Sequence, residues 1–374
     1  MSAIPDIRTL MEQGTCLADP LPGHLRFSNL PRMAIISIRA GLRAYFSTYR
    51  IAGVSQVLSQ GPSQPLKHDE IIRQESSPDY LEVYTETVLH LHYAIELALK
   101  ELLRQKHTLL ASSNLPHSAI LLCRLLHKES ISFKDEETLK SAEFAEALKR
   151  VITLANAKLL DGDLSIVINH KTLLEVLNTL RNKIIHRGLF VMDYSAFDLV
   201  ISAHIIPFLA EFLYLPQFEI QANLAVSSET TPLWKYKKLA CGIDPLKEIA
   251  NIGKNTEHAW EKLALLKELG RAAYQNPLDA PESSLAPFGV GDSNARCRAE
   301  QLAKHELSNL NPYAYHGANE ILKCPVCGLH SLVRYNDGDG NDTEVICTCC
   351  TFNVNRALGN AGNYGLPIDG FWSP

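Results

Sequence analysis

Residues Lys171–Gly188 have the sequence KTLLEVLNTLRNKIIHRG. Apolar side chains recur in this stretch at spacings of three and four, the period of one face of an α-helix. These residues are Leu173, Leu177, Leu180 and Ile184. A glycine directly after basic residues is a common helix terminator. We therefore expect a helix over Lys171–Arg187 whose polar edge carries Arg181, Asn182 and His186.

Helical patterns also lie on both sides of this stretch. Ser77-Pro78-Asp79 has the features of a helix start and opens a long amphipathic run to about Leu110. Further helical patterns cover Pro116–Leu126, Glu136–Ala157 and Asp193–Leu213. Because alternating β-branched residues are almost absent here, we expect residues 77–216 to form a bundle of four or five helices.

The rest of the chain divides into three segments. Residues 1–76 include a mixed apolar and basic run, Met33–Gln60, and the pattern leaves their fold open. Residues 217–310 are expected to be a helical connector with a Pro-rich linker. Residues 311–374 contain two strand-like runs around the turn NDGDGND, which predicts a small β-hairpin domain. The expected fold class is therefore mainly α, with a small β domain at the C-terminal end.

Composition excludes several classes of protein. The chain has 374 residues, of which 46% are hydrophobic and 21% charged, so general disorder is excluded. The net charge of −5 excludes a globally basic surface, so any nucleic-acid site must be local. The most apolar long stretch, Phe197–Pro216, is interrupted by charged residues and a proline. We expect neither a secretory signal nor a membrane span, and hence a cytoplasmic protein.

A metal site is predicted near the C-terminal end, where five of the nine cysteines lie between Cys324 and Cys350. Two CxxC pairs, Cys324/Cys327 and Cys347/Cys350, are separated by 19 residues. Zn²⁺ takes four thiolates tetrahedrally, and Gly328 suits the left-handed turn that such a knuckle needs.

This pattern resembles the zinc ribbon family over about 50 residues. Four thiolates would fill the coordination shell, so the expected zinc is structural. A disulfide pair and an iron–sulfur site are the alternatives. Cys349 and His330 are spare potential ligands.

The polar edge of Lys171–Arg187 points to a second site. Arg181 and His186 are five positions apart, and Glu96 lies on the long upstream helix. Arg181-Asn182-x3-His186 inside such a bundle resembles the HEPN superfamily over about 140 residues. The resemblance implies an all-α domain that dimerises, and many members are metal-independent endoribonucleases of toxin–antitoxin and antiviral systems. Arg181, Asn182 and His186 carry over directly, and Glu96 less securely because the family varies there.

The residue chemistry agrees with RNA cleavage. RNA supplies its own nucleophile, the 2′-hydroxyl. His186 can act as general base or acid near neutral pH, and Arg181 can stabilise the charge of the phosphate. Asn182 can orient His186 or a phosphate oxygen. The hypothesis is a homodimeric endoribonuclease with RNA as substrate and an antitoxin or defence protein as partner.

Other interpretations remain. The same bundle could serve as a non-catalytic RNA-binding or dimerisation scaffold with the zinc ribbon as an interaction module, or the ribbon could bind DNA. His90, His92 and Glu96 form a polar stripe that a metal could use, although a half-buried structural stripe is commoner. The aromatic and basic stretch Trp234–Lys238 could bind a nucleotide or be an ordinary surface segment. No P-loop, GxSxG elbow or HExxH motif is present.

Overall fold

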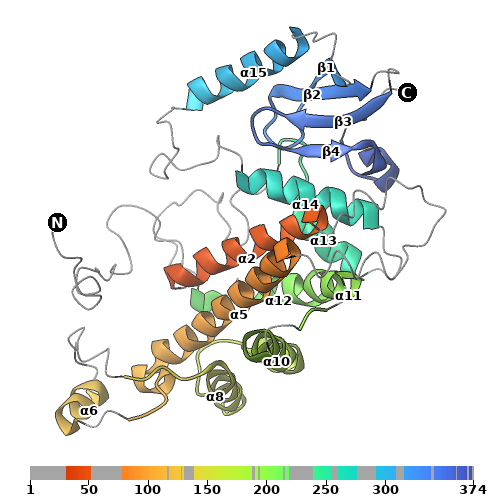
Figure 1. Cartoon of the computed structure of the whole chain (residues 1–374). Coiled ribbons are helices and arrows are strands. Elements are labelled where there is room, and N and C mark those ends of the chain that lie inside the picture. Colours follow the sequence, from red (N-terminus) through yellow and green to blue (C-terminus); the bar gives the residue numbers. More distant parts are fainter. Residues whose placement is uncertain are drawn as a thin grey trace, which may run out of the picture.

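Helix α5 (Pro78–Lys106) runs through the helical part of the molecule, and helices α2 (Arg32–Ile51), α8 (Phe144–Asn156) and α10 (Lys171–Arg187) pack against it (Figure 1). The structure is a computed structural model. It describes residues 31–51, 78–115, 118–127, 129, 139–187, 190–192, 194–213, 215–218, 239–254, 260–275, 292–308, 316–337, 341–358, 360–368 and 370–372. The predicted Pro-rich linker, at residues 276–291, and the stretch at 234–238 lie outside these ranges.

The predicted helical bundle with a small C-terminal sheet is confirmed (Figure 1). The remaining helices are α6 (Ala119–Leu126), α9 (Ser165–Asn169), α11 (Tyr194–Leu199), α12 (Ile206–Phe212), α13 (Pro245–Lys254), α14 (Trp260–Gln275) and α15 (Asp292–Ser308). Helix α10 has the predicted ends, and Leu177, Leu180 and Ile184 are buried as expected. None of the described helices combines the length and apolarity needed to cross a bilayer.

Two helices of the bundle differ from their predicted extents. Helix α8 starts at Phe144 rather than Glu136, and just before it the chain runs alongside the end of α5, where the Ala142 N–H donates to the carbonyl of Ala111 at 2.9 Å. The predicted helix Asp193–Leu213 is interrupted by a π-helical turn, Val200–Ile205. That widening lies just before Pro207, whose ring has no N–H to continue an α-helical ladder.

The C-terminal sheet is larger than the predicted hairpin. It has four antiparallel strands in the order β1 (His316–Lys323), β2 (His330–Asp337), β3 (Asp342–Cys347) and β4 (Asn353–Asn355). The predicted hairpin is β2 with β3, where Val333 pairs with Ile346. Helix α15 packs against β1 and β2, while α14 lies beside β4 (Figure 1). The sheet is thereby held between two helices.

A continuous hydrophobic core includes side chains from all four predicted segments of the chain. Phe46 of α2, Phe197 of α11, Leu266 of α14 and Phe352 of the ribbon are all fully buried members of it. Helix α2 belongs to the N-terminal segment whose fold the sequence left open, and its apolar face lies on α5 and α14.

Two glycines allow α2 to approach its neighbours closely. A Cβ atom on Gly270 of α14 would lie 2.8 Å from the ring of Phe46, and one on Gly41 of α2 would lie 2.9 Å from the side chain of Leu91. Because the Phe46 ring is itself fully buried, it has little room to move. Packing rather than helix propensity therefore explains the glycine in α14.

We expect Gly270→Ala to lower the free energy of unfolding by about 1–3 kcal/mol through overpacking. Helix propensity alone would change it by about 1 kcal/mol in the opposite direction, so the sign of the effect distinguishes the two. Gly362→Ala is the control, because no atom lies within 4 Å of the added Cβ and the change should stay within about 0.5 kcal/mol. Urea unfolding of both variants measures this, and a more stable Gly270→Ala protein would contradict the packing argument.

Candidate functional site

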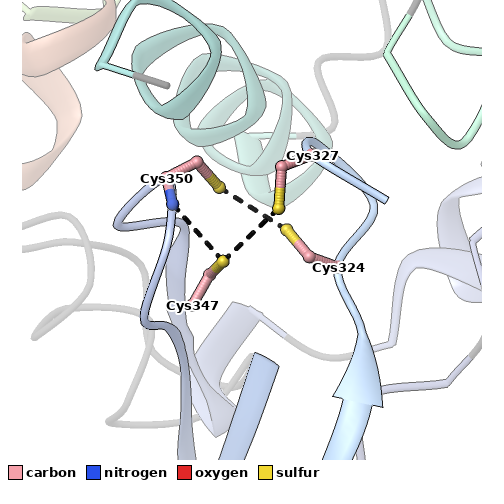
Figure 2. A group of neighbouring side chains, drawn as sticks. All are labelled: Cys324, Cys327, Cys347 and Cys350. Atoms are coloured by element: carbon pink, nitrogen blue, oxygen red, sulfur yellow. Dashed lines mark hydrogen bonds between the residues drawn. The ribbon is translucent and has the colours of Figure 1, made fainter. Parts of the chain in front are cut away.

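Four cysteines of the C-terminal sheet converge on one point. The sulfur atoms of Cys324, Cys327, Cys347 and Cys350 all lie within 4.8 Å of one another, and Figure 2 shows the side chains pointing toward a common centre. All four are free thiols, so the alternative of a disulfide pair does not describe this structure. The arrangement is a possible metal-binding site. Cys349 is buried and His330 exposed, and neither belongs to the group of four.

Each CxxC pair lies in a tight turn between two strands. In the first turn the Gly328 N–H donates to the carbonyl of Cys324 at 3.0 Å, and Gly328 has the expected positive φ of 76°. In the second turn Thr351 takes the equivalent position, with a φ of 58°. The N–H groups of Cys349 and Cys350 each donate to the sulfur of Cys347 at 3.4 Å. Such N–H···S bonds favour the thiolate that binds a metal.

The first turn is joined to the helical body through its backbone. The N–H of Cys241 donates to the carbonyl of Pro325 at 2.9 Å, and the N–H of Ala240 donates to the carbonyl of Val326 at 3.2 Å. Residues 240 and 241 lie just before α13. A Cβ on Gly328 would approach the methyl group of Ala240 at 3.1 Å. The metal-binding turn is therefore seated on the connector and is not a free surface loop.

The second turn is joined to α14 by charged side chains. Nη2 of Arg271 donates to the carbonyl of Thr351 at 2.5 Å. The carboxylate of Glu268 accepts from the N–H of Asn353, the first residue of β4, at 2.6 Å. In Figure 2 a helix of the connector lies across the cysteine group. Both turns that carry the cysteines are thus held by the connector, one just before α13 and the other on α14.

Glu268 is the centre of this contact and is completely buried. Its carboxylate accepts from Nη2 of Arg50 at 2.8 Å and from Nε of Arg271 at 2.7 Å, and it also accepts from the hydroxyl of Tyr49. Burial, together with the negative charge of Glu268, raises the pKa of Tyr49, so this phenol stays a donor. One carboxylate therefore joins α2, α14 and β4.

The second predicted site lies on the part of α10 that faces α5. Arg181 and Asn182 are half-buried, and Nη1 of Arg181 donates to Oδ1 of Asn182 at 2.9 Å. His186 is exposed in the last turn of α10. The structure thus joins Arg181 to Asn182 and leaves His186 open to solvent at the end of the helix.

Glu96 of α5 belongs to a polar group that meets α10. One oxygen of Glu96 accepts from Nζ of Lys100, and the other lies 3.9 Å from Nδ1 of His92. Nε2 of His92 lies 3.0 Å from Oδ1 of Asn178, one turn before Arg181 on α10. The polar stripe predicted from the sequence contains His92, but Asn178 is not among the predicted site residues. The spacing of three residues between Asn178 and Arg181, which places both on one side of a helix, is the signal that points to Asn178.

The charges of Glu96 and Arg181 both act on His92. Burial lowers the pKa of His92, the hydrogen bond to Asn178 and the charge of Glu96 raise it, and the charge of Arg181 lowers it again. Arg181 and Glu96 therefore both contribute to the electrostatic environment of His92. Among the described residues the cysteine group is where metal-ligating side chains gather, and the His90–Glu96 stripe is not such a group.

A hollow of about 440 Å³ lies elsewhere, beside α6, where Leu110, Leu126 and Arg150 line it. None of the predicted site residues lines this hollow. Comparison of the chain with models of known protein families, with curated proteins and with solved structures finds no match.

We expect Glu268→Gln to lower the free energy of unfolding by about 3–5 kcal/mol, because it leaves the buried guanidinium of Arg271 beside a neutral side chain. Hydrogen exchange should also become faster around β4, where Asn353 loses a charged acceptor. Glu248→Gln is the control: its carboxylate pairs with Lys262 at the surface, and the loss should stay within about 1 kcal/mol. Equal stability of the two variants would show that Glu268 is not the centre of the contact.

Proposed function

We propose that this chain is a metal-independent endoribonuclease of HEPN type. The observation that carries the proposal is the meeting of α5 and α10, where His92, which lies beside Glu96, contacts the helix that bears Arg181 and Asn182. Sequence resemblance alone supplied the motif on α10. The contact with α5 places a second helix, which carries the carboxylate of Glu96, beside this motif. A functional site needs such supporting residues to hold its side chains in position.

The proposed reaction uses the RNA's own 2′-hydroxyl. His186 removes its proton, the 2′-oxygen attacks the adjacent phosphorus, and the bond to the 5′-oxygen breaks. The products are a 2′,3′-cyclic phosphate and a 5′-hydroxyl, which takes a proton. Arg181 faces the phosphate with the N–H groups that Asn182 does not use, because guanidinium stabilises the additional negative charge of the transition state. Exposure of His186 at the end of α10 leaves it accessible to a polymer.

A second copy of the chain completes the proposed site. Ile185 lies one turn after Arg181 on α10 and is 45% exposed, so the surface beside the motif is apolar as well as polar. A homodimer that covers this side would bring two motifs together and exclude water. A role in toxin or antiviral defence, with an antitoxin or defence partner, belongs to the same proposal.

The cysteine group is proposed to hold a structural zinc ion. Bonds of about 2.3 Å from zinc to four thiolates give a tetrahedron with edges of about 3.8 Å. The sulfur atoms of Cys324 and Cys350 are 3.5 Å apart, and those of Cys327 and Cys347 are 3.7 Å apart. Four thiolates leave no open coordination position, so the ion would stabilise the fold and take no part in the cleavage.

The ribonuclease proposal predicts that His186→Ala lowers kcat on RNA by on the order of 10²–10⁴ while RNA binding is retained. His204→Ala is the matched control, because His204 is also an exposed helical histidine. The assay uses purified full-length protein in buffer without divalent ions, with the product ends mapped and the zinc content measured in the same samples. Equal cleavage by wild type and His186→Ala would refute the assignment. RNA binding without cleavage by either would favour a scaffold.

The zinc proposal predicts one zinc ion per chain in protein purified without chelator, measured by elemental analysis. Cys350→Ser should lose the ion and lower the unfolding temperature, since binding free energy at such sites is folding free energy. Cys349→Ser changes the adjacent thiol and should keep the ion, because Cys349 is outside the group of four. Iron in place of zinc, or zinc retained in Cys350→Ser, would contradict the proposal.

A further inference from the structure

His92 is buried where three helices of the bundle meet. Its side chain on α5 is 4% exposed, and its ring stacks on Phe144 of α8 with centroids 4.3 Å apart. Its Nε2 faces Oδ1 of Asn178 on α10 at 3.0 Å. A half-exposed histidine on a surface stripe would not need such partners on two other helices.

The hydrogen bond to Asn178 defines the form of the imidazole. A carbonyl oxygen accepts only, so Nε2 of His92 carries the proton and donates. In the neutral ring Nδ1 is then without a proton, and it lies 3.9 Å from an oxygen of Glu96. The other oxygen of Glu96 is bound by Lys100, which is buried. The bond to Asn178 therefore needs a proton on Nε2, which the neutral and the charged imidazole both provide.

We propose that His92 is a positioning residue, which through its Nε2–H holds Asn178 and with it the turn of α10 that presents Arg181 and Asn182. Asn178 precedes Arg181 by three residues and Asn182 by four, so all three lie on one side of α10. The effect of His92 on catalysis rests on the proposed ribonuclease function, whereas its effect on the position of α10 is independent of that function.

Acid should place an unfavourable charge on this buried ring without removing its contact to Asn178. The charged groups that face His92 are Glu96 and Lys100 of α5 and Arg181 of α10, while α8 presents the uncharged ring of Phe144. Burial lowers the pKa of His92 below its usual 6.5, against the opposing effects of Asn178 and Glu96. Because the folded pKa is below the unfolded one, the contribution of the neutral ring to stability is present above about pH 6.5 and decreases as the pH falls. The charged imidazole keeps its proton on Nε2, so the donor to Asn178 is present in both forms.

The kinetic test compares two substitutions. His92→Gln keeps an N–H donor near the place of Nε2 but does not titrate, and His92→Leu removes the donor. We expect His92→Leu to lower kcat for RNA cleavage about tenfold, the effect of one lost hydrogen bond, with KM within about twofold. His92→Gln should keep most of kcat. His90→Gln, on the neighbouring half-buried histidine, should keep the wild-type kcat. Equal losses of kcat in His92→Gln and His92→Leu would overturn the proposal.

A double-mutant cycle tests whether His92 acts through Asn178. If it does, the variant with both His92→Leu and Asn178→Leu has a kcat no lower than that of the worse single variant. Losses that multiply would overturn the proposal.

Hydrogen exchange of residues 177–187 tests the position of α10 without any activity. Exchange there should be faster in His92→Leu than in wild type or His92→Gln, and unchanged exchange in His92→Leu would overturn the proposal. If wild type cleaves no RNA, the proposed function fails, and the exchange experiment still decides the role of His92.

Discussion

Two consecutive charged residues of α14, Lys267 and Glu268, are buried and connect this helix to α2, α11 and the C-terminal sheet. Neighbouring residues of a helix point about 100° apart, so the two side chains reach different partners. Lys267 pairs with Asp198 of α11 and donates to Thr48 of α2 at 2.9 Å. Glu268 binds Arg50 of α2 and the start of β4. Because buried ions lose their hydration, such pairs add specificity more than net stability. An alternative packing of α14 would leave Lys267 without its carboxylate and Glu268 with only Arg271 of its own helix.

The position of the cysteine group follows from this arrangement. Zinc ribbons are often interaction modules, and the sequence predicts such a ribbon here. In this chain one cysteine turn is bonded to residues 240 and 241 just before α13, and the other is bonded to Arg271 of α14. A metal ion there would join the two turns to each other, and so would also stabilise their contacts with the helical body. Recognition of RNA or protein by the ribbon would use its other surfaces.

Local patterns explain which features the sequence could predict. The extents of α10 and the four cysteines follow from short-range spacing, and both are as expected. Strand β1 was missed because its sequence, HGANEILK, does not alternate, and β4 because it has only three residues. Lys267 appears in the sequence as an ordinary polar residue of an amphipathic helix. Its burial depends on Asp198, 69 residues away, and no local pattern records that pairing.

The same reasoning applies to the proposed catalytic helix. Arg181 and His186 can be found by motif, but what holds α10 in place lies on α5, where His92 meets Asn178. Helix α5 is in turn covered by α2, which α14 contacts through Glu268 and Gly270. Each step is a direct contact between two elements. The motif therefore depends on a buried network of which only His92, Glu96 and Lys100 lie close to it, and substitutions far from His186 can alter the site through the packing of α2 and α5.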